Sequence, residues 1–194
     1  MHDRFPRPSD HAALGLLALP ADVVQLCLLH QARPRLVAHL TLVHDVAAQL
    51  VDKVASTWPG LRFEADAVLF GAATHDIGKA LVPSELVQPG SEHEAKGRDL
   101  LRGAGVPDHL ARFATTHASW SVDEHVDIED LLVALADKVW KGKRDDELER
   151  RVVARIAGAT GMESWEVFAE LDGVLEELST QADERLRWQA QFTA

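Results

Sequence analysis

Apolar residues recur along most of the chain at the three- and four-residue spacing of amphipathic helices, and period-2 alternation of β-branched residues is nearly absent. This pattern predicts an all-α protein. Prolines and glycines divide the pattern, because proline suits the first turn of a helix and glycine follows the last turn. Ser91 and Asp127 are expected to cap two of the helices. The predicted helices cover 20–32, 34–56, 64–77, 92–103, a segment from 107 onward, 128–141, 144–158 and 162–189, with a loop at 80–90.

The stretch "AALGLLALPADVVQLCLLHQ" is the part of the sequence that most resembles a targeting signal. Pro20, Asp22 and Gln25 interrupt it well short of the length of a membrane span, so a packed N-terminal helix is expected. Cys27 is the only cysteine, which excludes an intramolecular disulfide and favours a reducing compartment. We therefore expect a cytoplasmic protein with no membrane partner.

Length and charge narrow the function classes further. A chain of 194 residues without internal repeats fits one domain, 1–194, with room for a substantial core. The net charge of −11 weighs against long nucleic acids, whose phosphates would be repelled. A small phosphorylated ligand remains compatible, because local cations or a metal ion can reverse the sign of the potential inside a pocket.

Helical phase separates two His-Asp pairs in the sequence. On the helix that follows Pro34 the apolar stripe runs from Leu36 to Val54, and His39 falls inside that stripe. His44 and Asp45 fall outside it. The phase therefore predicts that His39 points inward and that the pair His44-Asp45 only flanks the stripe.

Other polar residues lie in segments that are expected to be buried. The apolar run "FGAATHDIGK" ends in His75-Asp76 and breaks at Gly78. The segment "LLVALADKVW" is apolar on all sides except at Asp137 and the lysine after it, and a buried carboxylate is costly without a cation. His117 shares a stripe with apolar residues, and His93 shares a face with a glycine that would allow close helix approach.

Four imidazoles and two carboxylates are the donor set of a site for one or two divalent first-row transition metals. Taken singly, each residue has an ordinary explanation: a histidine on an apolar face is usually a satisfied core residue, Asp137 could pair with an arginine, and His93 could lie on the surface. Taken together they predict a metal site, and the absence of cysteine argues against a closed structural zinc site. The six candidate ligands are His39, His75, Asp76, His93, His117 and Asp137.

The order of these residues resembles the HD-domain metal-dependent phosphohydrolases. "THDIGK" looks like the central motif of that family, "LADKVWKGK" like its final Asp segment, and "HEAKGRDLL" with "GVPDHLARFATTH" like the region between them. The resemblance spans about 34–144 and implies a helical bundle with metal at its centre. Residues 1–33 would then be an N-terminal helical extension, and 145–194 would be C-terminal helices that pack on the core and offer a homodimer surface.

The resemblance also implies roles for the ligands. His39, His75, Asp76 and Asp137 would form the site shared across the family, while His93 and His117 would add a second metal with Asp76 as the bridge. His117 is followed by Ala118, where some two-metal members carry paired histidines, and no "GYP" segment follows. This departure argues against the cyclic-dinucleotide branch. The ligand set is more similar to small-nucleotide hydrolases of the family, including those that split dinucleoside polyphosphates.

These features predict a hydrolase in which a water activated by Mn, Fe, Co, Ni or Mg attacks phosphorus. Asp76 and Lys79 are the catalytic candidates. Lys79, Lys138 and Arg35 could each contact a substrate phosphate, although Arg35 could instead pair with an acid. Trp120 could stack on a base, or belong to the core or a lid. Two alternatives remain open: an HD module that binds a nucleotide or partner without chemistry, and a di-iron oxygenase of the same fold.

Overall fold

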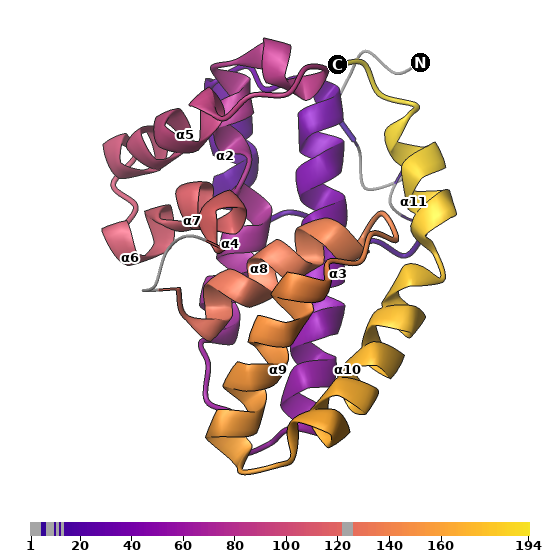
Figure 1. Ribbon diagram of the computed structural model, residues 1–194. Coiled ribbons are helices and arrows are strands. Elements are labelled where there is room, and N and C mark those ends of the chain that lie inside the picture. The colour runs from indigo at the N-terminus through magenta and orange to yellow at the C-terminus, as the bar shows by residue number, and fades with distance from the viewer. Residues whose placement is uncertain (1–4, 7–9, 11, 13, 122–125) are drawn as a thin grey trace.

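The computed structural model describes residues 5–6, 10, 12, 14–121 and 126–194, and Figure 1 shows that this part of the chain is all-helical, as predicted. Among the described residues there is no strand, and no helix is long and apolar enough to cross a membrane. The elements are α2 (Ala21–Leu29), α3 (Pro34–Thr57), α4 (Ala65–Thr74), the 3-10 turns η1 (Ile77–Ala80) and η2 (Pro83–Leu86), α5 (Glu92–Gly103), α6 (Asp108–Ala111), α7 (Phe113–Ser119), α8 (Ile128–Val139), α9 (Asp146–Thr160), α10 (Ser164–Ser179) and α11 (Ala182–Gln189).

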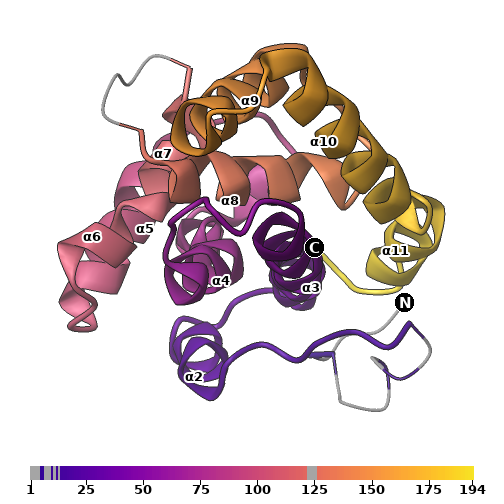
Figure 2. The same ribbon diagram turned by 90° about the horizontal axis from the view of Figure 1, so that it is seen from below.

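The long helix α3 lies in the middle of the molecule and packs against both α4 and α8. Helices α9 and α10 cover the outer side of α8, whereas α2 lies on the opposite side of α3 and α4 (Figure 2). The main apolar core fills the space between α3, α4, α8, α9 and α10. A smaller core around Val23, Cys27 and Leu36 joins α2 to the rest.

Two predicted helix ends differ from the structure. The first helix ends at Leu29 rather than near Ala32, because Gln31 takes a left-handed backbone conformation (φ 52°) and the Ala32 N–H bonds to the Cys27 carbonyl. The helix predicted over 162–189 is divided into α10 and α11. The Arg185 guanidinium donates to the Leu178 carbonyl at 2.6 Å, so a side chain of the second helix satisfies the end of the first.

The start of α8 is as predicted. Asp127 and Asp130 form a capping box, in which each carboxylate accepts from the backbone N–H of the other residue. Asp130 also binds the Arg112 guanidinium, so this end of α8 is fixed to the segment that carries α7. The helix that holds Asp137 therefore begins at a defined residue.

The prediction that His44 and Asp45 lie outside the buried stripe is wrong as a statement about burial. Both side chains are buried, with 4% and 7% exposure, because α3 is covered by neighbouring elements on several sides. The Asp45 carboxylate accepts hydrogen bonds from the Leu17 backbone and from Gln49, each at 2.8 Å. This second His-Asp pair is therefore a structural part of the core at the N-terminal segment.

Two glycines allow η1 to lie against α5. A Cβ atom on Gly78 would be 1.9 Å from the His93 carbonyl and 2.6 Å from the Gly97 nitrogen. A Cβ atom on Gly97 would be 3.1 Å from the Gly78 nitrogen. The close approach expected at Gly97 is confirmed, and it brings His93 to the turn that carries Asp76.

Candidate metal centre

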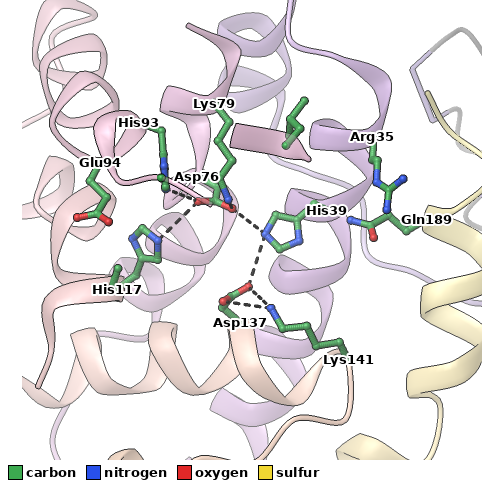
Figure 3. A pocket seen from close by; sticks show the side chains of 13 residues that line it. Arg35, His39, Asp76, Lys79, His93, Glu94, His117, Asp137, Lys141 and Gln189 are labelled. Atoms are coloured by element: carbon green, nitrogen blue, oxygen red, sulfur yellow. Dashed lines mark hydrogen bonds and ion pairs between the residues drawn. The ribbon is translucent and has the colours of Figure 1, made fainter. Parts of the chain in front are cut away.

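The structure brings the six candidate ligands together from five places in the chain. His39 lies on α3, His93 in the first turn of α5, His117 on α7 and Asp137 on α8. His75 and Asp76 occupy the turn between α4 and η1. Figure 3 shows the labelled members of this set converging on one pocket. We call these six residues the His/Asp cluster.

Asp76 is at the centre of the His/Asp cluster. Its Oδ2 atom lies 3.1 Å from His39 Nε2 and 3.6 Å from His75 Nε2. Its Oδ1 atom lies 3.0 Å from His93 Nε2 and 3.6 Å from His117 Nε2. The two carboxylate oxygens of Asp76 thus face two different pairs of imidazoles.

Asp137 completes only one side of this arrangement. Its Oδ1 atom lies 3.5 Å from His39 Nε2 and 3.8 Å from His75 Nε2, and these two imidazole nitrogens are 3.1 Å apart. His39, His75 and Asp137 place one ligand atom each within 4.8 Å of one another, as do His75, Asp76 and His117. The cluster therefore offers two overlapping groups of ligand atoms that could hold metal.

Hydrogen bonds at Nδ1 fix the orientation of three of the imidazoles. His75 Nδ1 lies 2.9 Å from the Ala72 carbonyl, and His117 Nδ1 lies 3.0 Å from the Phe113 carbonyl. A carbonyl only accepts, so both Nδ1 atoms carry the proton and both Nε2 atoms are left as acceptors. His93 Nδ1 bonds to the Glu85 carboxylate in the same way. Imidazoles that ligate metals are oriented by such bonds at the second nitrogen.

Two observations indicate that the His/Asp cluster is suited to hold a divalent cation. Asp76 Oδ1 and His93 Nε2 are buried and lie 3.0 Å apart, and neither has a hydrogen-bond partner by geometric criteria within the described residues. The acceptor atoms His75 Nε2 and His117 Nε2 each lie 3.6 Å from an oxygen of Asp76, and acceptors that face one another in this way repel unless a cation lies between them. Atoms bound to one ion at about 2.0–2.2 Å are themselves about 3.0–3.5 Å apart, which agrees with the observed spacing.

Protonation in the cluster favours ligation as well. Burial lowers the pKa of His75 to about 3, although the Asp76 carboxylate opposes this, so the imidazole is neutral at neutral pH. Burial disfavours ionisation of Asp76, but the imidazoles of His75, His39 and His93 hold its pKa well below the usual range. Burial likewise opposes ionisation of Asp137, and Lys141 lowers its pKa. The cluster thus presents a neutral His75 imidazole beside two ionised carboxylates.

Sequence reasoning missed Glu85, although Ser91 does occupy the predicted N-cap position of α5. The Ser91 side chain makes no cap hydrogen bond. The Glu85 carboxylate instead accepts from the backbone N–H groups of Glu92 and His93, each at 3.1 Å, and from His93 Nδ1. One acid on η2 therefore caps α5 and orients a ligand. An acid in a loop seven residues before a helix gives no local signal for this role.

We expect Glu85→Gln to weaken metal binding without unfolding the protein. An amide offers one oxygen where the carboxylate offers two, so either the cap of α5 or the bond to His93 Nδ1 is lost. Loss of such a supporting bond typically reduces metal affinity about 10–100-fold. Calorimetric titration with Mn²⁺ measures this. Glu94→Gln is the matched control, since Glu94 also lines the pocket but, among the described residues, bonds to no imidazole. Equal weakening in both variants would contradict the role of Glu85.

Two lysines contact the carboxylates of the cluster. Lys79 Nζ lies 2.6 Å from Asp76 Oδ2, and Lys141 Nζ lies 3.4 Å from both oxygens of Asp137. Lys79 was a candidate from the sequence. Lys141 was not among the candidates from the sequence. It stands one turn after Asp137 on the same helix face, and this i, i+4 spacing is the pattern that indicates the ion pair.

The other substrate candidates are divided by the structure. Arg35 lines the same pocket as the cluster. Lys138 is half-buried and does not line it. The Trp120 side chain is 7% exposed, belongs to the main core and lies 5.8 Å from the Arg151 guanidinium. Of the roles that the sequence allowed for Trp120, the structure therefore supports packing in the core rather than stacking on a base.

The pocket over the cluster has a volume of about 300 Å³. The pocket is lined by side chains of the His/Asp cluster together with those of Lys79, Lys141, Arg35 and Gln189 (Figure 3). This arrangement can accommodate a small anion in contact with the cluster.

Comparison with protein families gives one match: the family model described as HD domain matches residues 36–140, which is more than half of the chain. Comparisons with curated proteins and with solved structures gave no match. The matched residues include every member of the His/Asp cluster. Arg35, Lys141 and Gln189 lie outside the matched segment.

Proposed function

The chain belongs to the HD domain family, and on this premise we propose that it is a metal-dependent phosphohydrolase acting on a small nucleotide or another small phosphoester. The observation that supports this most directly is the set of four Nε2 atoms around the two oxygens of Asp76. Neutral imidazole and carboxylate are donors suited to Mn, Fe, Co or Ni, and carboxylate also to Mg.

The ligands divide naturally between two ions. His39, His75 and Asp137 would hold one ion together with Asp76 Oδ2, and His93 and His117 would hold another together with Asp76 Oδ1. A divalent ion bound here supplies Lewis acidity towards a phosphoryl oxygen and lowers the pKa of a coordinated water.

The protein's own groups support binding of a phosphoryl group. Asp76 holds the Lys79 ammonium at the pocket wall, where it can donate to a phosphoryl oxygen. Among the described side chains that line the pocket there is no serine, threonine or cysteine, so a covalent intermediate on such a nucleophile has no support. Cys27 is buried in the smaller core, where burial raises the pKa of its thiol to about 12.

The size of the pocket and the charge of the chain support a small substrate. A volume of about 300 Å³ is at the lower end of typical ligand pockets. The net charge of −11 supports the exclusion of long nucleic acids. A cytoplasmic location and a homodimer stay predictions.

The test is a panel of mononucleotides, cyclic nucleotides and dinucleoside polyphosphates, each assayed with Mn²⁺, Co²⁺, Fe²⁺ or Mg²⁺. We expect hydrolysis that requires added metal and that is lost in Asp76→Ala. Stoichiometric metal binding without turnover of any compound would instead favour the non-catalytic binding module. Oxygen consumption that depends on iron would favour the di-iron oxygenase.

The division of the ligands also predicts the number of ions. Elemental analysis of metal-loaded protein is expected to give more than one ion per chain, because His93 and His117 face an oxygen of Asp76 that the other ligands do not face. His117→Ala should lower the value towards one while the circular dichroism spectrum stays that of a helical protein. A wild-type chain that never exceeds one ion under excess metal would leave His93 and His117 without a ligand role.

A further inference from the structure

Three side chains at one edge of the pocket are not explained by metal binding. Arg35 lies in the first turn of α3, Lys141 follows the end of α8, and Gln189 is the last residue of α11. All three line the pocket and are half-buried. Figure 3 shows Arg35 and Gln189 on the same side of the pocket, beyond His39. All three side chains carry N–H donors, which is the chemistry of a site for an anion.

Among the described arginines whose side chains make no hydrogen bond or ion pair, Arg35 is half-buried, whereas Arg33, Arg62 and Arg187 are exposed. Lysine and arginine together number 20 against 31 aspartate and glutamate residues. Several other arginines form ion pairs with these acidic residues. Arg98 binds Asp108, and Arg144 binds both Glu149 and Asp172. Within the described part of the chain the Arg35 guanidinium has no hydrogen bond or ion pair, while its backbone N–H is fixed to the Thr193 carbonyl at 2.9 Å.

The two neighbours of Arg35 in the pocket also have donors to offer. Among the described residues the Gln189 amide has no hydrogen-bond partner, although the residue is half-buried. Lys141 Nζ has only the two 3.4 Å contacts to Asp137, which leave part of its donor capacity unused. The guanidinium of Arg35 and the amide of Gln189 are therefore available to the acceptor atoms of a ligand in the pocket.

The position of these donors relates them to the metal ligands. Arg35 is one helical turn before His39, and Lys141 is one turn after Asp137. One turn is about 5.4 Å along a helix axis, so one molecule with adjacent phosphate groups can contact both the ligands and the donors.

We propose that Arg35, Lys141 and Gln189 form a subsite for a second phosphate group, so that the substrate belongs to the diphosphates or polyphosphates rather than the simple monoesters. The inference rests on the proposed function only for the phosphoryl group at the His/Asp cluster. The subsite itself requires binding and not turnover.

The experiment measures the affinity of Mn²⁺-loaded protein for inorganic phosphate and for pyrophosphate by calorimetry. We expect wild type to bind pyrophosphate at least tenfold more tightly than phosphate. Arg35→Gln should lose most of that difference by weakening pyrophosphate about tenfold, while phosphate affinity changes less than twofold. Arg33→Gln is the matched control, because Arg33 is exposed, two residues away and outside this pocket, and the same charge is removed. Lys141→Met should also weaken pyrophosphate binding, but it is not expected to leave phosphate binding unchanged, because Lys141 contacts the metal ligand Asp137.

Each outcome decides the proposal. Equal affinities for the two anions in wild type, failure of wild type to bind either, or equal weakening by Arg33→Gln and Arg35→Gln would overturn the subsite. Hydrolysis of monoesters with no preference for pyrophosphate would overturn the subsite and leave the proposed function intact. A preference that depends on Arg35, in a protein that hydrolyses nothing on the phosphoester panel, would support the subsite while the proposed function fails.

Discussion

Asp76→Ala is expected to abolish the stabilisation of the protein by Mn²⁺. Both oxygens of Asp76 face imidazole nitrogens of the His/Asp cluster, so its loss removes the carboxylate that lies between the two pairs of imidazoles. A metal that binds only the folded state stabilises it by roughly 3–4 kcal/mol at some hundreds of times the Kd. For a chain of this length that corresponds to a melting shift on the order of 10 °C. Thermal denaturation with chelator and with Mn²⁺ measures the shift.

Asp45 provides a matched control, because it belongs to the second His-Asp pair. Its hydrogen bonds to Leu17 and Gln49 tie the N-terminal segment to α3. Asp45→Asn should lower the melting temperature, since a hydrogen bond to a charged group contributes about 1.5–3 kcal/mol. The shift on adding Mn²⁺ should be preserved. An equal loss of that shift in Asp45→Asn and Asp76→Ala would contradict the assignment of the His/Asp cluster as the metal centre.

Gly78→Ala is expected to destabilise the protein by about 3 kcal/mol or more, because the new methyl group meets backbone and not a flexible side chain. The closest atoms would be the His93 carbonyl at 1.9 Å and the Gly97 nitrogen at 2.6 Å. To relieve this contact, η1 and α5 must separate, and Asp76 then moves away from His93. We expect a lower midpoint in urea unfolding together with weaker metal binding.

Gly158→Ala tests the same substitution without the contact. Gly158 lies inside α9, and a Cβ atom there would meet nothing within 4 Å. Alanine has the higher helix propensity, so this variant should gain up to about 1 kcal/mol. If Gly78→Ala were as stable as Gly158→Ala, η1 and α5 would not be held at the distance that the structure gives.

Much of the cluster could be predicted from the sequence because its members lie in strongly patterned helices. Helical phase alone predicts that His39 points inward, and an almost wholly apolar helix implies that Asp137 lies near a cation. The same reasoning misjudged the burial of Asp45, because phase describes one helix and not the elements around it. Helix α3 is contacted by α4, α8, α10 and α11, so more than one face of it is covered.

The parts that could not be predicted depend on contacts between distant segments. Glu85 acquires its role only because η2 packs beside the start of α5. The separation of α11 from α10 depends on where Arg185 can reach the Leu178 carbonyl. Gln189, the last residue of α11, lines the pocket beside segments that are distant in the sequence. None of these residues stands in a local pattern that would select it.

The way in which the imidazoles are held has a consequence for local opening of the fold. His75 and His117 are oriented by carbonyls of their own helices, Ala72 and Phe113, so their orientation persists as long as those helices do. His93 depends on Glu85, which belongs to a turn with no buried residue. Sub-global opening of that turn would release one ligand and leave the others in place. Hydrogen exchange of the Glu92 and His93 amides would therefore be faster than exchange within α4, and metal should slow it selectively.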